Sequence, residues 1–459
     1  MRKSSVSTLA IALFAGACSF KPPLDRLMSP VAAHYPEKTD GVVPADIAWQ
    51  KFFTDPRLKK LVETALANNR DLRIAALNVE QSRAQYGISR SELFPSITGK
   101  ASSDRQRSLG SSSTAVMTTT SNPYALTVGL SSYELDLFGR VRSLNDSALE
   151  KYFASDEARV GAQISLVAEV ANQYLTERAL QQQVALSEQT LDGMNAAYGL
   201  MKQRFDAGTV SELDLSSTEV QQQTAKADLA AFRQRIALVN HSLTFLAGGS
   251  LPAGLPQGRS LDQVIVADVK AGVSSDLLRR RPDIREAEHQ LRAANANIGA
   301  ARAAFFPNIT LTANTGTASQ SFSKLFNNGT GTWLFAPSVN LPIFTGGRNK
   351  ANLDAAKVGK NIEIARYERA IQTGFREVAD GLAARSGLAE RISATERLVA
   401  AQHKRAELAN ARYNQGVDSY FEVLTATLDL YSSRQNLIQL RLAQAVNSVS
   451  LYKALGGGW

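Results

Sequence analysis

The stretch AANANIGAARAAFFPNITLTAN, residues 293–314, changes character in its middle. Its first half is rich in alanine and predicts a helix. After Pro307 apolar and polar residues alternate strictly, which predicts a strand. Proline separates the two, because it cannot continue a helix and it disfavours helical geometry in the residue before it. The stretch AQYGISRSELFPSIT, residues 84–98, makes the same change much earlier, so we expect helices that run directly into strands.

The two stretches are copies within an internal repeat. Residues 71–98 match residues 283–310, and residues 204–211 match residues 412–419. A duplication of so long a period is a strong signal of repeated architecture. Each copy predicts a helix, two strands, a long helix, a turn and a second long helix. The expected segments are a signal peptide over 1–17, a lipidated N-terminal segment with the equatorial region over 18–60, a first repeat over 61–249, a linker with equatorial residues over 250–272, and a second repeat over 273–459.

The long helices carry a heptad pattern. Seam positions follow one another at spacings of four and three over residues 180–205, and residues 388–413 keep the same phase. A repeat of 3.5 residues predicts antiparallel coiled-coil helices that supercoil left-handedly. No proline interrupts residues 141–205, so this helix can reach about 100 Å. Gly208 and Gly416 stand where the helices must reverse, because glycine allows the positive φ of a helix C-terminus.

Four segments of about ten residues predict strands, and this length crosses a bilayer when the strand is tilted. In three of them large apolar residues alternate with small or polar ones. The apolar residues are Tyr124, Leu126, Val128 and Leu130, then Ile309, Leu311 and Ala313, then Trp333, Phe335, Val339, Leu341 and Ile343. The strand after Pro95 is weaker, with only Ile97 as a large apolar residue. A soluble sheet packed on one side is the alternative.

The segments between the strands predict membrane-surface features. The stretches SLGSSSTAVMTTTSN (108–122) and SFSKLFNNGTG (321–331) are rich in serine, threonine, glycine and asparagine and predict exposed extracellular loops. The expected return junctions from strand to helix are Gly139-Arg140 and Gly347-Arg348. Aromatic girdles are expected from Phe94, Tyr124, Phe305, Phe306, Trp333 and Phe335.

The number of strands predicts assembly. Four strands cannot close a barrel, and an open edge cannot exist in lipid, because its backbone groups would lack hydrogen-bond partners. Two chains would give eight strands with a filled interior, whereas three would give twelve strands and a plausible pore. The expected fold class is therefore an α+β membrane protein, in which a long antiparallel coiled-coil α-helical barrel joins a trimeric 12-stranded β-barrel with four transmembrane β-strands per chain.

The N-terminus predicts export and a lipid anchor. A short positive start and the apolar stretch LAIALFAGA (9–17) precede the single cysteine, Cys18, which is typical of a secretory signal peptide. The stretch resembles the bacterial lipoprotein signal, which implies a lipid attached to Cys18. Ala15 stands where that pattern usually has leucine, and a plain signal peptide is the alternative. By the rule known for such lipoproteins, Ser19 after the cysteine implies sorting to the outer membrane.

Composition and motifs exclude other classes. The net charge of +9 is modest and the basic residues are scattered, so nucleic-acid binding is not expected. The histidines form no recognised metal spacing, and the sequence has no nucleophile elbow, P-loop or paired-carboxylate motif. We therefore expect no enzyme activity, no metal and no cofactor other than the covalent lipid on Cys18. The histidines are His34, His241, His289 and His403.

The stretch SDLLRRRPDIREAEHQLRAANANIGAARAAFFPNITL (275–311) resembles the signature of the outer-membrane efflux proteins of the TolC/OprM type, in the lipoprotein branch called NodT-like. The stretches SSYELDLFGRVR (131–142), SELDL (211–215) and SVSLYKALGGGW (448–459) agree with it. The resemblance covers essentially the whole chain. It implies a lipid-anchored homotrimer in the cell outer membrane, with a helical tunnel that extends into the periplasm. Such a channel conducts small toxic compounds or drugs from a periplasmic adaptor protein and an inner-membrane transporter.

The resemblance also implies a gate at the periplasmic tip, in RYNQGVDSYFEVLT, residues 412–425. The matching positions are Tyr413, Asp418, Phe421 and Glu422. Three copies of Glu422 would form a ring that selects cations and whose members repel one another. Thr425 stands where family members often carry aspartate, so one tier of negative charge is missing. Ordinary solvated polarity at a helix end is the alternative.

The resemblance implies further contacts at the turns. Gly208 with Ser211, and Gly416 with Ser419, are the expected contacts of the adaptor. The run Arg279-Arg280-Arg281 is expected at a solvated helix edge or opposite acidic side chains of a neighbouring subunit. Two other transport functions compete with efflux. A passive porin would need far more strands per chain, whereas a type I secretion conduit for polypeptides shares the fold and stays an alternative.

Overall fold

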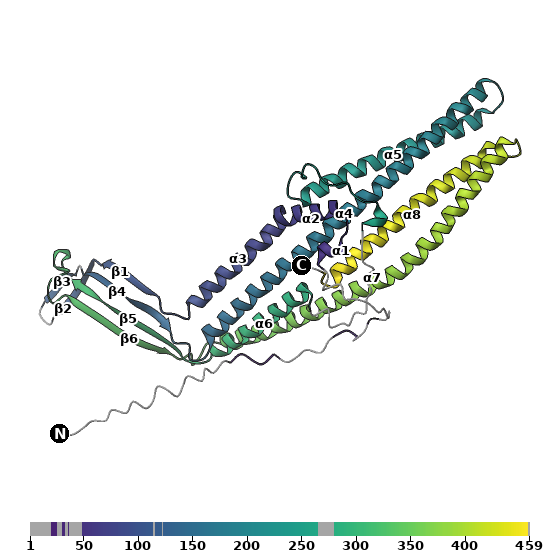
Figure 1. Cartoon of the computed structure of the whole chain (residues 1–459). Helices are drawn as coiled ribbons and strands as arrows, with labels where there is room; N and C mark the ends of the chain where they lie inside the picture. Colours follow the sequence, from purple (N-terminus) through teal and green to yellow (C-terminus); the bar gives the residue numbers. More distant parts are fainter. Residues whose placement is uncertain are drawn as a thin grey trace. The chain divides into compact units, whose positions relative to one another are not determined.

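The computed structural model describes residues 20–24, 30–32, 35, 48–112, 115–121, 123–264 and 280–457. The predicted signal peptide, Cys18, Arg279 and the end of the predicted linker lie outside the described residues. The chain divides into two compact units, and each takes segments from both halves of the sequence (Figure 1). The first unit comprises residues 1–27, 78–155 and 287–367, and the second comprises residues 28–77, 156–286 and 368–459.

Each half of the chain forms the same three helices. The pairs are α3 Arg70–Ser91 and α6 Pro282–Ala303 with 22 residues each, α4 Arg140–Asp206 and α7 Arg348–Asn414 with 67 each, and α5 Glu212–Leu246 and α8 Tyr420–Ala454 with 35 each. A helix of 67 residues is about 100 Å long. Two short helices, α1 Trp49–Phe52 and α2 Pro56–Asn68, precede α3. In the described part of the chain, no helix is long and apolar enough to span a membrane.

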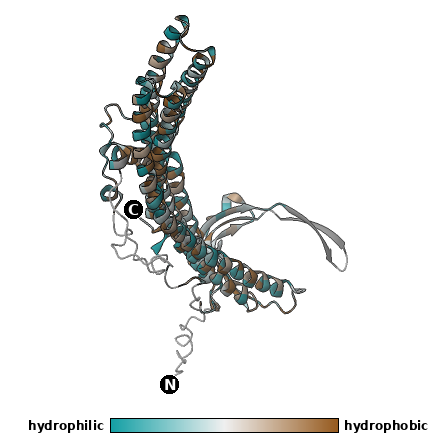
Figure 2. Cartoon of the chain, turned by 90° about the vertical axis from the view of Figure 1, so that its right-hand side faces the viewer, coloured by the Kyte–Doolittle hydropathy of each residue, from teal (hydrophilic) through white to brown (hydrophobic). Residues whose placement is uncertain are grey.

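The heptad seam is buried at several of its positions, whereas its last position in the first copy, Phe205, is 38% exposed. In the first copy Leu180, Ser187 and Met194 are 5%, 0% and 4% exposed, and Leu388 and Ile392 are also buried in the second. Figure 2 shows hydrophobic and hydrophilic residues alternating along the long helices. Burial of this stripe is what holds such helices together, since propensity alone is weak.

The first unit contains an antiparallel sheet. Its strands are β1 Ile97–Ser103, β4 Tyr124–Glu134, β5 Asn308–Ser319 and β6 Gly331–Asn340, in the order β1-β4-β5-β6 (Figure 1). Within the described chain the strands β1 and β6 each pair on one side only, so they form the two edges of this sheet. A single chain therefore presents an open sheet.

One loop prediction is wrong. Residues 108–122 were expected as an exposed loop, but β2 Gln106–Ser112 and β3 Ala115–Ser121 pair as an antiparallel hairpin. The physical reason is that serine and threonine resemble loop residues in composition, while threonine and valine fit a pleated strand once a partner strand satisfies the backbone. The second predicted loop, residues 321–331, contains the short 3-10 helix η4 Phe322–Lys324 and ends at Gly331, the first residue of β6.

The sheet has one apolar face and one polar face, because residues paired across antiparallel strands point the same way. The apolar face carries Ile97, Gly99, Ala101 and Ser103, then Tyr124, Leu126, Val128, Leu130 and Tyr133, then Ile309, Leu311, Ala313, Thr315, Thr317 and Ser319, then Gly331, Trp333, Phe335, Pro337 and Val339. None of these residues is charged. Trp333 and Phe335 are 80% and 61% exposed, so large side chains on this face are uncovered in the single chain.

A β-bulge in β4 was missed by the sequence analysis. Leu130 pairs with Ala313 and Tyr133 with Leu311, so two residues of β4 face one of β5. Ser132 has a φ of 56°, and its amide donates to Oγ1 of Thr312 at 3.2 Å. The extra residue returns Tyr133 to the apolar face, which plain alternation would not do.

The junctions from strand to helix lie at the predicted glycines. Gly139 and Gly347 have φ values of 75° and 87°, and the helices α4 and α7 begin at the next residue. At the first junction Arg140 binds Glu134 through Nε and Nη2 at 2.8 and 2.5 Å. This hydrogen bonding outweighs burial and raises the pKa of Arg140.

Candidate functional site

The segment that follows Cys18 packs in the first unit. The Phe20 ring stacks on Phe306 with a centroid distance of 4.5 Å, and the Asn295 amide donates to the carbonyl of Pro22 at 2.8 Å. Cys18 lies two residues before Phe20 in the chain.

Both helical hairpins end in a glycine turn in the second unit. Gly208 and Gly416 have φ values of 74° and 71°. After Gly416, the amide of Val417 donates to the carbonyl of Arg412 at 3.0 Å, and the corresponding residues of the first turn make the same bond. These bonds satisfy carbonyls that the helix end leaves open. The glycines therefore make the predicted reversals.

The two serines after the turns differ. Ser211 accepts from the amide of Asp214 at 3.1 Å, and the Asp214 carboxylate accepts from the amide of Ser211 at 3.3 Å, which is a capping box. Ser419 begins α8 without a side-chain capping bond. A capping box therefore fixes the start of α5, whereas the start of α8 has none.

The predicted gate residues Tyr413 and Asp418 each bind an arginine. Asp418 accepts from Nη2 of Arg412 at 2.9 Å, and its other oxygen accepts from Nε at 2.5 Å. This hydrogen bonding lowers the pKa of Asp418 and raises that of Arg412. The Arg204 guanidinium donates to the Tyr413 hydroxyl and lies 5.4 Å from its ring centroid. Tyr413 also meets the ring of Tyr420 edge-on at 5.2 Å.

The other gate candidates are Phe421 and Glu422. Phe421 is 62% exposed, and Glu422 is exposed with no ion pair to the described residues. The hydroxyl of Thr425 donates to the carbonyl of Phe421 at 2.9 Å. Thr425 is therefore bound within its own helix, and it lacks the negative charge that an aspartate would bring.

Sequence reasoning missed the cationic partners of the gate, Arg204 and Arg412. The signal was present, because the repeat aligns these two arginines with each other. A groove of about 580 Å³ lies between α4, α7 and α8, and the rings of Tyr413, Tyr420 and Tyr431 contribute to its wall. Tyr431 also shares a hydrogen bond of 2.8 Å with Ser187 in the buried seam of α4.

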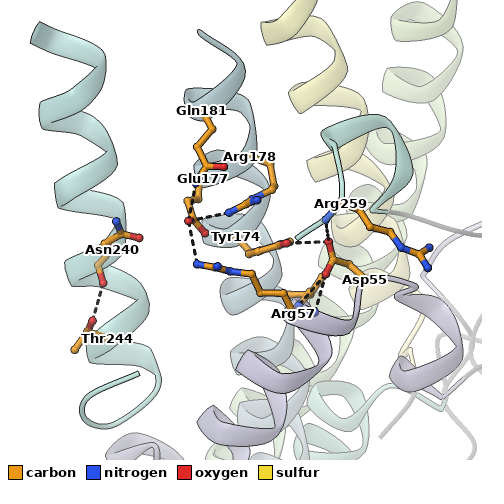
Figure 3. Close-up of polar contacts among 10 residues, drawn as sticks. Asp55, Arg57, Tyr174, Glu177, Arg178, Gln181, Asn240, Thr244 and Arg259 are labelled. Carbon is orange, nitrogen blue, oxygen red and sulfur yellow. Dashed lines mark hydrogen bonds and ion pairs between the residues drawn. The ribbon is translucent and has the colours of Figure 1, made fainter. Parts of the chain in front are cut away.

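A polar hub around Asp55 joins the N-terminal helices to α4 in the second unit (Figure 3). Asp55 is fully buried and caps α2, accepting from the amides of Arg57 and Leu58 at 2.7 and 3.3 Å. It also accepts from the Tyr174 hydroxyl at 2.8 Å and from the amide of Arg259 at 2.7 Å. One carboxylate thus holds three separate segments of the chain.

A second carboxylate completes the hub. Glu177 is 2% exposed, and its Oε1 accepts from Arg57, Arg178 and Gln181 at 3.4, 2.9 and 3.0 Å (Figure 3). Nearby, a Cβ at Gly258 would overlap the Tyr174 hydroxyl, so this position must be glycine while the hub is intact. The hub therefore positions helices.

The expectation for the arginine run is wrong at Arg281. This side chain is 6% exposed and neither solvated nor at a free edge. Its Nη1 donates to the carbonyl of Ala454 at 2.7 Å, and its Nη2 donates to Asp283 and Glu377, each at 2.8 Å. The physical reason is that the end of α8 leaves carbonyls that need donors, and a buried guanidinium needs acceptors.

Buried tyrosines predict a loss of stability at alkaline pH. Burial raises the pKa of Tyr35 to about 12, and burial also raises the pKa of Tyr174 and Tyr452. A tyrosine whose pKa is higher in the folded chain contributes its full stabilisation at pH values below the unfolded-state pKa of about 10. That stabilisation is lost as the pH rises through the folded-state pKa. We expect the free energy of unfolding to be level up to about pH 9 and to fall between about pH 10 and 12.

Denaturant titrations at successive pH values, with tyrosinate absorbance as a second probe, measure this loss. The substitution Tyr174→Phe removes one ionisable group and should make the alkaline fall shallower. Equal slopes for the variant and the wild-type chain would contradict the assignment.

In the described part of the chain, no group of three or more His, Cys, Asp or Glu side chains could hold a metal ion. The architecture instead combines an uncharged sheet face with long helical hairpins that end in tight turns. A solved structure with the same architecture is the open state of the MtrE outer membrane channel of Neisseria gonorrhoeae. It has a TM-score of 0.88, is 40% identical, and the match covers 96% of this chain and 98% of that one. The fold defined here is that of an outer-membrane channel.

Sequence relatives identify the family. The pattern of the family described as outer membrane efflux protein matches residues 61–249 and 273–457. The toluene efflux pump outer membrane protein TtgC and the antibiotic efflux pump outer membrane protein ArpC, both of Pseudomonas putida, are each 46% identical over 466 residues. Each match covers 100% of this chain and 96% of the relative. The chain belongs to the outer membrane efflux protein family, and it is an efflux channel of the outer membrane.

Proposed function

We propose that three copies of this chain form the outer-membrane duct of a tripartite efflux system, which takes small toxic compounds from a periplasmic adaptor and an inner-membrane transporter. The observation that supports it best is the open four-stranded sheet with an uncharged apolar face. Each charge on a lipid-facing strand costs about 2–4 kcal/mol at the membrane midplane, so a face without charges suits lipid.

The edges of the sheet support assembly. The free sides of β1 and β6 would have unpaired backbone groups in lipid, where each costs several kcal/mol. Pairing β6 of one copy with β1 of the next removes both edges when the ring closes. Three copies give twelve strands, which is enough for an open passage. Detergent-extracted protein should therefore sediment as a trimer, and a stable monomer would contradict the proposal.

The proposal includes a lipid anchor on Cys18. A lipid on Cys18 would hold the chain at the inner side of the outer membrane, because each buried methylene contributes about 0.8 kcal/mol. Labelling with radioactive palmitate, compared between the wild-type chain and Cys18→Ala, tests the attachment. The duct itself acts by passage alone, without catalysis.

We further propose that the second tip is the gate and that it opens when the helix pairs shift outward. Asp418, Arg412 and Tyr413 tie the start of α8 to the end of α7, and Glu422 and Phe421 face the passage. The turns at Gly208 with Ser211 and Gly416 with Ser419 then receive the adaptor. The pKa of Asp418 is lowered, so its ion pair with Arg412 is fully present at pH values above the ordinary pKa of aspartate. The ion pair is lost only as the pH falls through the lowered pKa of Asp418.

Single-channel recordings in planar bilayers test the gate. Asp418→Ala frees Arg412, and Glu422→Ala removes the proposed carboxylate ring, so each should raise the conductance severalfold. The matched control is Glu212→Ala, which removes an exposed carboxylate from the first turn of α5. Wild-type conductance in both gate variants, or an equal rise in the control, would count against this tip as the gate.

The class of compound is proposed from the relatives. Toluene and antibiotics appear in the names of proteins that are 46% identical. A strain that lacks the gene should become sensitive to such small compounds. If the strain instead kept its resistance and lost a secreted polypeptide, the type I secretion conduit would be the better reading.

A further inference from the structure

We infer that Lys100 determines which ions the duct prefers: three copies of its ammonium group form a positive ring that attracts anionic solutes and repels cations. The inference rests on the proposed trimer, because only a closed barrel turns the polar face of the sheet into the lining of a passage.

The strand register places Lys100 on the polar face. Lys100 pairs with Thr127, Thr127 pairs with Gly316, and Gly316 pairs with Thr332, so these four residues form one row across β1, β4, β5 and β6. The rows on either side of it belong to the apolar face. If the apolar face meets lipid, the ammonium group of Lys100 points into the water-filled interior, since strand side chains alternate between faces.

Lys100 is the uncompensated charge of this face. Among the described residues of β1, β4, β5 and β6, only Lys100 and Glu134 are charged. Glu134 is bound by the Arg140 guanidinium, whereas Lys100 is exposed and forms no ion pair with the described chain.

The physical range of such a ring depends on salt. At about 0.01 M ionic strength the Debye length is about 30 Å, so the charges act across the whole width of a small barrel. At about 0.15 M it is about 8 Å, and the ring acts mainly on ions that pass near the wall. The proposed ring of Glu422 has the opposite sign, so the two positions favour different classes of solute.

Reversal potentials in planar bilayers test the inference. In a potassium chloride gradient at low ionic strength, Lys100→Gln should lower the anion-to-cation permeability ratio about twofold or more, and Lys100→Glu should lower it further. The matched control is Lys60→Gln, which removes the same charge from an exposed lysine on α2. An unchanged ratio in both Lys100 variants, or an equal change in the control, overturns the inference.

Thiol labelling tests the same face without relying on conductance. In Lys100→Cys a membrane-impermeant, negatively charged methanethiosulfonate should react and change the permeability ratio. In Val128→Cys, on the apolar face, the reagent should react no more than it does with the wild-type chain. The reverse pattern overturns the inference.

The outcomes separate the two proposals. A wild-type chain that is monomeric and non-conducting defeats the proposed trimer and this inference together. A conducting trimer whose ion selectivity is unchanged in the Lys100 variants defeats only the role of Lys100.

Discussion

Replacing Gly316 by valine should abolish the folded sheet. A Cβ at Gly316 would overlap the carbonyl oxygen of Leu126 and lie 2.7 Å from Cα of Thr127, whereas real Cβ atoms essentially never come within 3.0 Å of such atoms. The clashing atoms are backbone, so they cannot move aside as the end of a side chain could. The central strands β4 and β5 would have to separate, and their hydrogen bonds would be lost.

Gly129 makes the reciprocal contact from β4 and supports this expectation. A Cβ there would overlap the carbonyl oxygen of Ala313 and Cα of Asn314 on β5. Both glycines lie on the polar face, and glycines at defined positions let a sheet curve. Figure 2 shows the strands as a curved sheet. Losing this central pairing should cost on the order of 4 kcal/mol or more, which is the range of severe single substitutions.

Gly99→Val is the matched control for Gly316→Val. Gly99 lies on β1, and a Cβ there would meet no atom within 4 Å. Valine favours strands, so this variant should fold as the wild-type chain does. The measurements are the yield of heat-modifiable oligomer in outer membranes and the urea midpoint of the purified protein. A Gly316→Val protein with wild-type yield and midpoint would refute the close approach of β4 and β5.

The second large effect is expected for Asp55→Ala in the helical unit. The substitution leaves the amides of Arg57, Leu58 and Arg259 and the hydroxyl of Tyr174 without their acceptor. A lost N-cap costs about 0.5–2 kcal/mol, and each unsatisfied buried donor costs about 1–3 kcal/mol. The free energy of unfolding should therefore fall by about 4 kcal/mol in total.

Two further variants make the Asp55 test specific. Asp55→Asn keeps the size and one acceptor oxygen, so its loss should be smaller than that of Asp55→Ala. Glu63→Ala breaks an exposed ion pair with Lys60 on the same helix and should change stability by less than about 0.5 kcal/mol. Denaturant unfolding followed by circular dichroism compares the three variants. If all three unfold at the same midpoint, Asp55 is not the hub that its contacts describe.

Part of the hub could have been predicted and part could not. The sequence Asp55-Pro56 before a helical run is an N-cap signal, because aspartate caps and proline suits the first helical turn. Tyr174 and Arg259 approach Asp55 from 119 and 204 residues away. No local pattern reports such partners, since they depend on which surfaces meet in the folded chain.

The gate shows the same division. The repeat and the resemblance located Tyr413, Asp418, Phe421 and Glu422, and their roles stay predictions. Arg204 binds Tyr413 and Arg412 binds Asp418. The repeat aligns these two arginines with each other, but it does not indicate what they bind. For Arg281 the local run of charges predicts a solvated side chain. In the structure its guanidinium is buried and donates a hydrogen bond to the carbonyl of Ala454, 173 residues away.

The sequence by itself determined the properties that depend on neighbouring residues. These are the two faces of each strand, the buried seam of each long helix, the glycine reversals and the duplication of the whole unit. Only the tertiary structure decided the β2–β3 hairpin, the bulge at Ser132, the glycines that let β4 meet β5, and the burial of Arg281. The physical reason is that periodicity and turn geometry are set within a few residues of the chain. Strand register, close backbone approach and the partner of a buried charge are set by segments that are distant in sequence and meet only on folding.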